Sequence, residues 1–406
     1  MKILQVNVVY KRGSTGKIVD DIHYVLKQKG HESVICYGRG QNEEESNVYK
    51  TSSELGAKVH SLTARISGIQ YSSSYFATNN LINIIKKENP NIVHLHCING
   101  YFVSIYRLLD FLKKQGIKTV LTLHAEFMFT GSCGHSFECE KWKSGCGNCP
   151  QLWKATKSIF FDRTDTAWSK MENSFRGFEN LTIVSVSDWL DRRAKQSPFF
   201  KNKKFVVIEN GIDTTNVFHP ISYFSDLKKK YNLNGEKIIV HVTAGFTDRP
   251  DDIKGGLYII ELAKRLKNEN IKILVIGGNK NLVGLPNNII NVGRINNQKE
   301  LAGYYSMADL CVITSKRETF SMPCAESLAC GTPIVGFKAG APETISLKEY
   351  SEFVNYGDMD ALEATVRMWI YKKDSFKDRL AKRAVEHYSR VRMSERYIDV
   401  YKSILR

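Results

Sequence analysis

The feature that most constrains the fold of this chain is a regular alternation of short apolar segments with amphipathic helical segments. Residues 2–10 form an apolar strand, and apolar side chains then recur at helical spacing from Ile18 to Leu26. Strands that alternate with helices favour a parallel sheet, because parallel neighbours need a long crossover connection. In such a doubly wound α/β fold, ligands bind beyond the carboxyl ends of the strands.

The alternation continues through the first half of the chain. We expect strands at residues 33–37, 91–96, 118–124, 181–186 and 204–208. We expect helices near residues 55–66, 79–88, 103–114 and 156–177, and one that begins after Ser187 as its N-cap. The turn sequence at residues 209–213 marks a boundary, so a first domain is predicted over residues 1–215.

The second half repeats the pattern and predicts a second doubly wound domain over residues 216–387. Strands are expected at residues 237–243, 271–276, 289–292, 310–314 and 332–336. Helices are expected from residue 256 to about residue 267, at residues 298–307 and after Pro323, and the rest should be mostly helical. Residues 388–406 should form a C-terminal helix that packs back on the first domain.

The charge balance indicates anionic partners. The formal net charge is +16, and basic residues are in excess in both halves. No like-charged block or nucleic-acid-binding motif is present, so we favour nucleotide-sugar phosphates and an anionic membrane surface over nucleic acid. No apolar run is long enough to span a bilayer, and residues 1–10 lack the features of a signal peptide. These features predict a cytoplasmic protein.

Two carboxylates bracket the segment from residue 315 to residue 333. Glu318 and Glu326 enclose a short apolar loop, Pro323 stands where a helix could begin, and Gly331 stands where it could end. A helix N-terminus gathers unpaired N–H groups and suits the phosphates of a nucleotide. The alternative is an ordinary loop-to-helix junction with two surface glutamates.

The first half contributes glycines and histidines at positions where a ligand could bind. Gly13 and Gly16 follow the first strand and would let the backbone approach a ligand, or would merely form a tight turn. His96 and His124 each end a predicted strand. A histidine there could meet a substrate or could hydrogen-bond to nearby backbone.

Four cysteines lie close together in a glycine-rich insertion over residues 131–150. The residues are Cys133, Cys139, Cys146 and Cys149, and the last two form a C-x2-C pair. In a reducing cytoplasm, clustered cysteines favour one structural zinc ion, with free thiols or disulfides as the alternatives. Four thiolate ligands would close the coordination shell, so the ion would fold the insertion.

Several of these motifs, in this order, resemble the retaining glycosyltransferases of family 4. They are the pair Glu318/Glu326 followed by residues 331–333, residues 210–213, Lys254-Gly255, the glycine loop near the N-terminus, and His124. The resemblance covers essentially the whole chain. It implies the GT-B fold, in which two Rossmann-like domains with parallel sheets face each other across a deep interdomain cleft.

The resemblance also implies a donor site with divided roles. Glu326 would bind the ribose hydroxyls, and Glu318 would lie by the transferred sugar. Lys254 would neutralise the diphosphate, and His124 would lie near the sugar. The further donor-binding positions are Gly16, Arg249, Arg294, Ile295, Phe320, Ser321 and Met322.

Three departures from the family pattern stand out. Phe246 follows Gly245 where the family often has arginine, and Arg249 could supply the guanidinium instead. Ser321 replaces a common glycine and would narrow the sugar pocket. The cysteine segment is absent from most members but is similar to one in some transferases of bacterial surface-polysaccharide pathways.

A transferase of this kind would move a hexosyl or N-acetylhexosaminyl group from a UDP- or GDP-sugar to a glycan acceptor. The acceptor is expected to be lipid-linked, in O-antigen, capsule or other surface-polysaccharide synthesis, with the enzyme peripheral on the inner face of the membrane. No catalytic metal is expected, because Lys254 and a helix end supply positive charge and Asp358-Met359-Asp360 is better interpreted as a helix start. The alternatives are a GT-B sugar-nucleotide epimerase and a non-catalytic glycan- or nucleotide-binding module.

Overall fold

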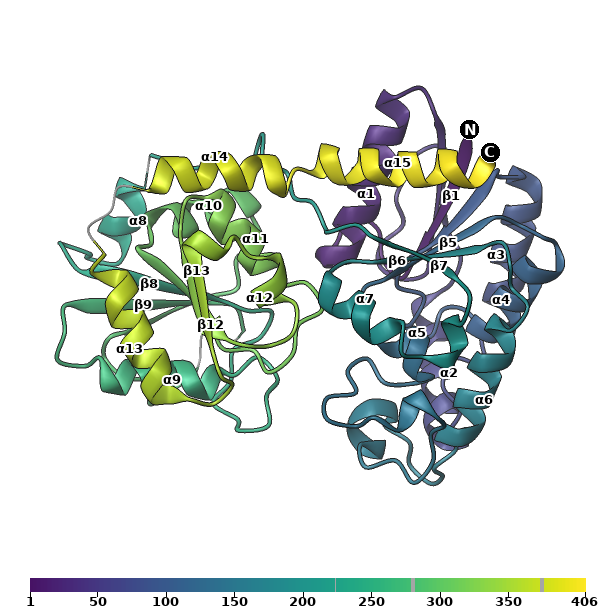
Figure 1. The fold of residues 1–406 in the computed structure, drawn as a ribbon, viewed down its shortest axis with the longest axis horizontal. Helices are drawn as coiled ribbons and strands as arrows, with labels where there is room; N and C mark the ends of the chain where they lie inside the picture. The colour runs from purple at the N-terminus through teal and green to yellow at the C-terminus, as the bar shows by residue number, and fades with distance from the viewer. Residues whose placement is uncertain (223, 279–281, 373–375) are drawn as a thin grey trace. The chain divides into compact units, whose positions relative to one another are not determined.

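The computed structural model describes residues 1–222, 224–278, 282–372 and 376–406. The chain divides into two compact units, each of which contains a parallel sheet covered by helices (Figure 1). Unit 1 comprises Met1–Glu209 together with Met393–Arg406, and unit 2 comprises Asn210–Arg392. The α/β prediction and the prediction of parallel sheets are confirmed.

Unit 1 contains a seven-stranded sheet in the order β3-β2-β1-β4-β5-β6-β7. Every pair of neighbours is parallel. The strands are β1 (Lys2–Asn7), β2 (Glu32–Tyr37), β3 (Val48–Lys50), β4 (Ile92–Leu95), β5 (Thr119–Leu123), β6 (Leu181–Ser185) and β7 (Lys204–Val207). The order reverses between β1 and β4, and a reversal of this kind places ligand-binding loops at the carboxyl ends of the strands.

The helices of unit 1 cover the sheet and include a long helix from the end of the chain. They are α1 (Gly13–Gln28), α2 (Glu54–Ser67), α3 (Tyr75–Glu88), α4 (Ile105–Lys114), α5 (Phe127–Thr130), α6 (Thr164–Phe175), α7 (Asp188–Ala194) and α15 (Arg390–Leu405), which belongs to unit 1 from Met393 onward. Met393, Tyr397 and Tyr401 of α15 share a buried cluster with Ile18 and Ile22 of α1. This apolar burial fixes α15 against the sheet of unit 1.

The single long helix expected over residues 156–177 is a wrong prediction. The helix α6 begins only at Thr164, and Lys157 adopts a left-handed conformation with φ of 54°. The carboxylate of Asp162 accepts the N–H of Thr164 at 3.0 Å and its hydroxyl at 2.6 Å. An aspartate side chain that binds nearby backbone in this way favours a turn over helix continuation.

Unit 2 contains a six-stranded parallel sheet in the order β10-β9-β8-β11-β12-β13. The strands are β8 (Lys237–Val242), β9 (Ile271–Ile276), β10 (Ile289–Gly293), β11 (Leu310–Ile313), β12 (Ile334–Phe337) and β13 (Ser351–Val354). The helices are α8 (Ser225–Lys230), α9 (Gly256–Arg265), α10 (Gln298–Met307), α11 (Met322–Ala329), α12 (Pro342–Ile345), α13 (Met359–Ile370) and α14 (Lys377–His387). The strand β11 leads into the loop that carries Glu318.

Two predicted caps are confirmed, and two edge strands were not predicted. The Ser187 hydroxyl accepts the N–H of Leu190 at 3.2 Å, and Asp358 accepts the N–H of Ala361 at 3.0 Å, so Asp358-Met359-Asp360 is a helix start.

The strands β3 and β13 lie at sheet edges. Each has only three or four residues, too few for a clear periodic pattern.

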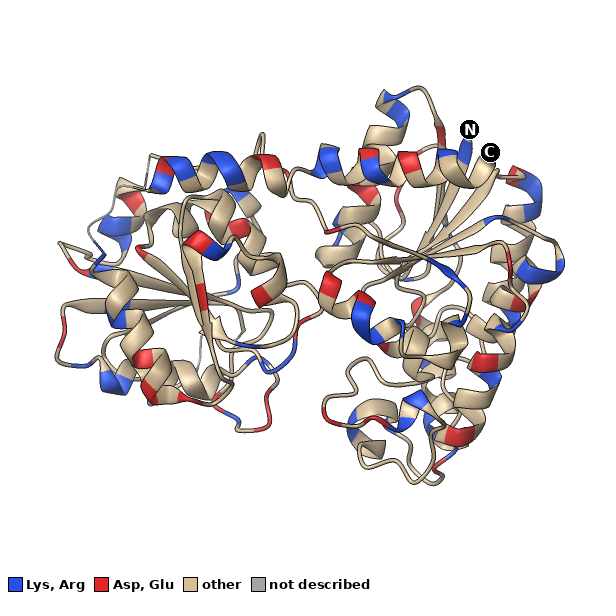
Figure 2. Cartoon of the chain, viewed as in Figure 1, with Lys and Arg blue, Asp and Glu red and all other residues tan. Residues whose placement is uncertain are grey.

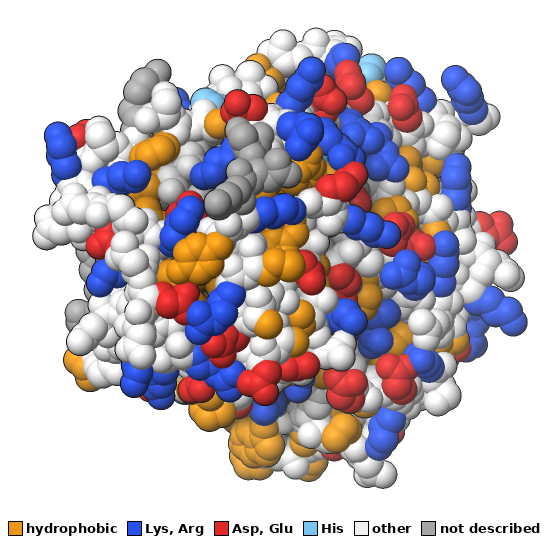
Figure 3. All heavy atoms as spheres, turned by 60° about the vertical axis from the view of Figure 1, so that its left-hand side comes forward, with side chains coloured by type: hydrophobic (Ala, Val, Ile, Leu, Met, Phe, Trp, Pro, Cys, Tyr) orange, Lys and Arg blue, Asp and Glu red, His pale blue; other side chains and the backbone are white. Residues whose placement is uncertain are grey.

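Charged side chains of both signs are mixed on both units. Figure 2 shows Lys and Arg interspersed with Asp and Glu along the helices, and Figure 3 shows the same mixture on the face that it draws. This distribution agrees with the absence of a like-charged block in the sequence. Among the described residues, no helix has the length and apolar character needed to cross a membrane.

Candidate active site

Glu318 lies in the loop between β11 and α11, and a neighbouring loop fixes its backbone. Its N–H donates to the carbonyl of Ala339 at 2.9 Å, and its own carbonyl accepts the N–H of Ala341 at 3.2 Å. These bonds form a parallel bridge with Gly340. The carboxylate is therefore presented from a defined position beyond the carboxyl end of a parallel strand, where ligands of such sheets bind.

Lys254 lies on the loop before α9 and forms an ion pair with Glu318. Its Nζ is 2.7 Å from Oε1 of Glu318, and the two side chains are 29% and 16% exposed. The Thr314 hydroxyl donates to the carbonyls of Lys254 and Gly255 at 3.2 and 2.9 Å. A Cβ on Gly255 would lie 2.2 Å from the Thr314 carbonyl oxygen, so only glycine permits this approach. The structure thus brings together two predicted site residues.

Glu326 lies on α11 and is nearly buried. The Tyr305 hydroxyl of α10 donates to its Oε2 at 3.1 Å. Burial and the neighbouring Glu326 carboxylate raise the pKa of Tyr305 well above its ordinary value, so the hydroxyl stays protonated and remains a donor. Sequence reasoning missed Tyr305, which lies in no motif. Its hydrogen bond orients the Glu326 carboxylate.

The start of α11 holds the three predicted backbone positions. Ser321 precedes the helix with φ of 82°, Phe320 is buried, and Met322 is the first helical residue, with Pro323 next. The helix therefore begins one residue before Pro323. The helix directly follows the loop that carries Glu318.

The other predicted donor positions of unit 2 lie on exposed loops. The Arg249 guanidinium pairs with Asp251 at 3.2 Å. Arg294 is exposed and Ile295 half-buried, directly after β10. Phe246 is buried, with its ring edge-on to His241, so the residue that replaces the expected arginine serves the core of unit 2. Contact of Arg249, Arg294 and Ile295 with a donor stays a prediction.

In unit 1, His124 directly follows β5 and contacts His96. Nε2 of His124 is 3.2 Å from Nδ1 of His96, and the two rings stack at a centroid distance of 5.5 Å. Nε2 of His96 lies 3.1 Å from Oε1 of Gln5. Both ring nitrogens of His96 therefore bind side chains, which was neither of the two roles expected for it.

This chain of contacts fixes the tautomer of His124. The Oε1 atom of Gln5 can only accept, so Nε2 of His96 carries the proton and its Nδ1 accepts. Nε2 of His124 then donates to that Nδ1, which leaves Nδ1 of His124 as an acceptor. The Gln5 amide nitrogen donates to the Val19 carbonyl at 3.4 Å, which supports this orientation of the amide. Burial lowers the pKa of His124 to about 4, so its ring is neutral near pH 7.

A second buried network links this region to α15. Nδ1 of His94 is 2.6 Å from the Tyr401 hydroxyl, and its Nε2 is 2.8 Å from the Thr122 hydroxyl. The Thr122 hydroxyl in turn is 3.1 Å from the Tyr397 hydroxyl. The ring centroids of His94 and His96 lie 3.8 Å apart. The C-terminal helix therefore supports the strand ends that carry His96 and His124.

Gly16 lies in the first turn of α1 and packs against the strand end before it. A Cβ on Gly16 would lie 3.2 Å from the Val9 carbonyl oxygen, and the Gly16 carbonyl accepts the N–H of Lys11 at 3.2 Å. Gly13 has φ of 61°. Both glycines therefore serve the turn, and a role of Gly16 in donor binding stays a prediction.

Two family descriptions together match most of the chain. The family described as Glycosyltransferase Family 4 matches residues 16–216, and the family described as Glycosyl transferases group 1 matches residues 223–387. The chain belongs to the family 4 glycosyltransferases. The family predicted from the motifs is therefore confirmed.

Relatives and solved structures support the same assignment for this glycosyltransferase. It is 22% identical to the putative colanic acid biosynthesis glycosyl transferase WcaC of Escherichia coli K12, over 100% of both chains. It is 26% identical to the N-acetyl-alpha-D-glucosaminyl L-malate synthase of Bacillus anthracis, over 97% of this chain and 93% of the relative. The structure of Anabaena HepE in complex with UDP-glucose matches with a TM-score of 0.64 at 14% identity, over 99% and 100% of the two chains. The GT-B fold is confirmed.

Cys133 in the cysteine insertion of this glycosyltransferase interacts electrostatically with the other three thiols. Burial raises the pKa of Cys133, and the thiols of Cys149, Cys146 and Cys139 raise it further. Among the described residues, no three His, Cys, Asp or Glu side chains are gathered closely enough to hold a metal ion. A shared zinc ion, with the four thiolates as ligands, stays a prediction from the donor set.

Metal analysis tests the zinc prediction. We expect the purified glycosyltransferase to contain about one zinc ion per chain, because four thiolates satisfy a tetrahedral ion. The variant Cys146→Ser should lose it, whereas Cys311→Ser, which removes a buried thiol of unit 2, should retain it. Protein that lacks zinc and exposes four titratable thiols in the insertion would contradict the prediction.

The position of Ser321 predicts a gain in stability on substitution by glycine. Its φ of 82° lies in the left-handed region, which costs a residue with a Cβ about 1 kcal/mol. We therefore expect Ser321→Gly to raise the free energy of unfolding by about 0.5–1 kcal/mol in urea titrations. The control Ser169→Gly, on the exposed face of α6, should lower it by about 0.5 kcal/mol. Loss of stability in Ser321→Gly would mean that the hydroxyl matters more than the backbone.

Buried histidines predict acid sensitivity of the glycosyltransferase. His241 is buried, its Nδ1 donates to the Val312 carbonyl at 2.9 Å, and burial lowers its pKa to about 4. Unfolding raises that pKa towards about 6.5, so protons are taken up and stability falls as pH drops through this window, by up to about 1.4 kcal/mol per pH unit. Urea titrations at about pH 7 and about pH 5 measure the loss, which should be smaller in His241→Asn. An equal loss in that variant would contradict the assignment to His241.

Proposed function

We propose that this glycosyltransferase moves a sugar, with retention, from a nucleotide diphosphate sugar to a lipid-linked glycan acceptor. The donor would be a UDP- or GDP-sugar that carries a hexosyl or N-acetylhexosaminyl group. The product would enter a surface polysaccharide such as O-antigen or capsule. The enzyme would work in the cytoplasm, peripheral on the inner face of the membrane.

The observation that carries this proposal is the Lys254–Glu318 ion pair beyond the carboxyl end of β11. Departure of a nucleoside diphosphate builds negative charge on its phosphate oxygens. A lysine and a helix N-terminus fixed beside those oxygens stabilise the transition state more than the ground state. Lys254 and the start of α11 supply these two groups from one unit, with Glu318 between them in the sequence.

Retention is proposed to follow a front-face route. The bond between the anomeric carbon and the diphosphate oxygen breaks, and the acceptor hydroxyl oxygen bonds to that carbon from the same face. A departing phosphate oxygen takes the proton of the acceptor hydroxyl, so atoms and charge balance. The carboxylate of Glu318 would orient the sugar, and its ion pair with Lys254 would hold it in place.

The remaining roles follow the same donor. The buried carboxylate of Glu326 would accept hydrogen bonds from the ribose hydroxyls, with Tyr305 fixing its orientation. Nδ1 of His124 would accept a hydrogen bond from a sugar hydroxyl. Further donor contacts are proposed for Gly16, Arg249, Arg294, Ile295 and the backbone N–H groups of Phe320, Ser321 and Met322.

Two similarities support the choice of donor and pathway. The structurally similar HepE binds UDP-glucose, which supports a nucleotide-sugar donor here. The relative WcaC is named for colanic acid biosynthesis, which supports a place in surface-polysaccharide synthesis. The malate synthase relative shows why the acceptor has to be measured, because its name describes a different kind of acceptor.

The test is product analysis with a panel of sugar nucleotides and extracted lipid-linked acceptors. We expect a glycan one sugar longer, seen by mass spectrometry, with the anomeric configuration of the donor retained by NMR. Conversion of the donor without acceptor would favour an epimerase. Tight nucleotide binding with no turnover on any acceptor would favour a binding module.

A further inference from the structure

An apolar stripe runs along the outward face of α2. Leu55, Val59, Leu62 and Ile66 follow each other at helical spacing and are all exposed, Leu55 to 72%. The opposite face carries Ala57, His60 and Ala64, which are buried. A surface helix normally directs its apolar stripe inward, so this second stripe on the solvent side requires another explanation.

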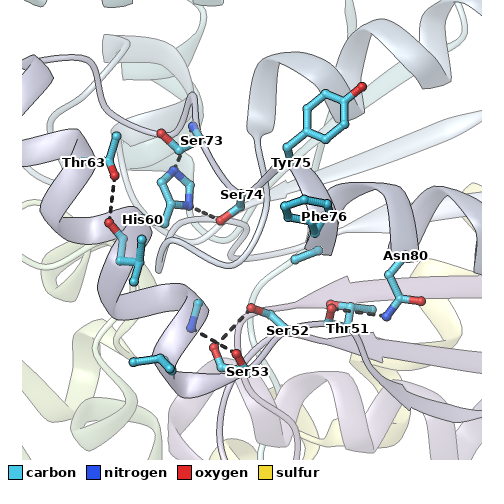
Figure 4. A pocket seen from close by; sticks show the side chains of 14 residues that line it. Thr51, Ser52, Ser53, His60, Thr63, Ser73, Ser74, Tyr75, Phe76 and Asn80 are labelled. Carbon is cyan, nitrogen blue, oxygen red and sulfur yellow. Dashed lines mark hydrogen bonds between the residues drawn. The ribbon is translucent and has the colours of Figure 1, made fainter.

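The start of α3 extends this apolar face. Phe76 is 88% exposed, and Tyr75 is exposed beside it. Both line a hollow of about 710 Å³ together with Leu55 and Val59 of α2 (Figure 4). The hollow is open and continuous with the apolar stripe of α2.

The polar groups at the base of this hollow are satisfied by the protein itself. Nδ1 of His60 donates to the Tyr101 carbonyl at 2.8 Å, and its Nε2 accepts the N–H of Ser73 at 3.0 Å. The Ser74 hydroxyl donates to the same Tyr101 carbonyl at 2.9 Å. Because these groups need no ligand, the hollow favours an apolar occupant.

A third segment lies against the end of α2 and adds aromatic side chains. The N–H of Ile159 donates to the Arg65 carbonyl at 2.8 Å, and a Cβ on Gly68 would lie 2.6 Å from the Phe161 carbonyl oxygen. Trp153 and Phe160 are exposed on the same segment. We call residues 55–76 and 153–161 the α2 surface.

The α2 surface concentrates the exposed apolar side chains of the protein. Of the seventeen large hydrophobic side chains that are exposed among the described residues, ten belong to it. They are Leu55, Val59, Leu62, Ile66, Tyr75, Phe76, Trp153, Ile159, Phe160 and Phe161. Such concentration on one unit marks an interaction surface, because isolated exposed side chains would be scattered.

Basic side chains accompany this surface, which contains no Asp or Glu, and the acidic side chains that flank it are already engaged. Exposed basic residues on these segments are Lys58, Arg65, Lys154 and Lys157. Glu54, at the start of α2, pairs with Arg39 at 2.7 Å. Asp162, just beyond the surface, accepts the N–H groups of Cys149 and Thr164. The charge that remains for a partner is therefore positive.

We propose that the α2 surface docks this glycosyltransferase on an anionic lipid bilayer. The proposal rests on the proposed function, because a lipid-linked acceptor resides in such a bilayer. Aromatic and aliphatic side chains would enter the boundary between headgroups and acyl chains, and the lysines would contact lipid phosphates. Exposed Trp and Tyr beside Lys and Arg are typical of the membrane interface. A second copy fits less well, because a two-fold interface would bring the same positive charges together.

Vesicle sedimentation tests the docking. The full chain should sediment with vesicles of about equal phosphatidylglycerol and phosphatidylcholine, less with phosphatidylcholine alone, and less at high salt. The variant Val59→Ser/Phe76→Ser should lower the fraction bound about tenfold or more. The matched control Met368→Ser/Tyr371→Ser removes two exposed side chains of unit 2 and should bind as the wild type. All four side chains are exposed, so equal melting temperatures should show that the variants fold.

The outcomes separate this proposal from the proposed function. Docking is overturned if the wild type fails to sediment, or if the Val59/Phe76 variant sediments like it. It is also overturned if that variant only turns a dimer into a monomer, since a second copy would then cover the surface. A water-soluble short-chain acceptor should be used equally well by the wild type and the variant. Vesicle binding without transfer to any acceptor would leave docking supported and remove the transferase proposal.

Discussion

Replacing Lys254 with alanine is expected to lower kcat by about 10²–10³-fold, because the charge that stabilises the departing diphosphate is lost. The donor KM should change less, since the interaction strengthens as the bond breaks. Glu318→Gln should also lower kcat strongly, by removing the charge that orients the sugar. Steady-state kinetics with the donor identified by the panel measures both effects.

A matched control and a folding check accompany these variants. Lys338→Ala removes an exposed lysine of unit 2 that bonds to Asn355 at 3.0 Å, and it should leave kcat unchanged. The Lys254–Glu318 pair is partly exposed, so breaking it should cost at most about 1 kcal/mol of stability. Full activity in both Lys254→Ala and Glu318→Gln would overturn the site assignment.

The double variant Lys254→Ala/Glu318→Gln separates two explanations for the pair. If Lys254 only held the Glu318 carboxylate in place, the double variant would be no slower than the slower single variant. If Lys254 acts on the diphosphate and Glu318 on the sugar, the two losses should approximately multiply. We expect the second result, because the backbone of Glu318 is already fixed by Ala339 and Ala341 without the lysine.

The helix starts at Ser187 and Asp358 were predictable from the sequence because they depend on local chain features. Each side chain caps its helix by accepting a backbone N–H three residues ahead. Such constraints leave a mark within a few positions of the sequence. The order of strands and helices was predictable for the same reason.

The parts that were missed depend on contacts between distant positions. Tyr305 reaches Glu326 from another helix, and Gln5 reaches His96 across 91 positions of the chain. Gln5 lies within β1 and is fully buried, and a polar residue in an apolar strand was the available signal. The helix α6 begins at Thr164 and not near residue 156, because the Asp162 carboxylate accepts the N–H of Thr164. A side-chain hydrogen bond can thus override a helical pattern in the sequence.

The position of Ser321 shows how structure changes the interpretation of a departure from the family pattern. From the sequence, a serine in place of glycine suggested a narrower sugar pocket. The structure adds a backbone reason for glycine at this position, since φ is 82°. The Ser321 hydroxyl accepts from the Cys324 thiol at 3.2 Å, which anchors the side chain within α11. Ser321 therefore carries a backbone strain and a hydrogen bond from Cys324, and both are separate from any effect on the sugar pocket.

His124→Ala is expected to lower kcat/KM by about 10²-fold, and His96→Ala by about tenfold. The first removes a group proposed to bind the sugar. The second keeps that imidazole but removes the partner that orients it, because Nδ1 of His96 accepts the proton of His124 Nε2 at 3.2 Å. His96 is therefore a positioning residue, and its loss should act mainly on kcat, with a smaller change in KM.

The tautomer of His124 gives a readout that a merely structural role would not affect. In the wild type, ¹⁵N NMR of histidine-labelled protein should show His124 protonated on Nε2 and neutral near pH 7. In Gln5→Glu, a carboxylate still accepts the proton of His96, so tautomer and activity should be retained. In Gln5→Lys, the ammonium can only donate, so the tautomer of His96 should reverse and its Nδ1 should donate to Nε2 of His124. The proton of His124 would then lie on Nδ1, which could no longer accept a hydrogen bond from the sugar.

The control for these substitutions is His94→Gln, which alters the buried network beside His96. His94 bonds to Tyr401 and Thr122, so its loss should destabilise unit 1 while the bond between His96 and His124 remains. Reduced stability with the wild-type tautomer at His124 and near-normal kcat is the expected result. If Gln5→Lys or His96→Ala reverses the tautomer of His124 and activity is unchanged, the acceptor nitrogen of His124 has no part in transfer. That outcome would remove the role proposed for His124 and leave the assignments of Lys254 and Glu318 standing.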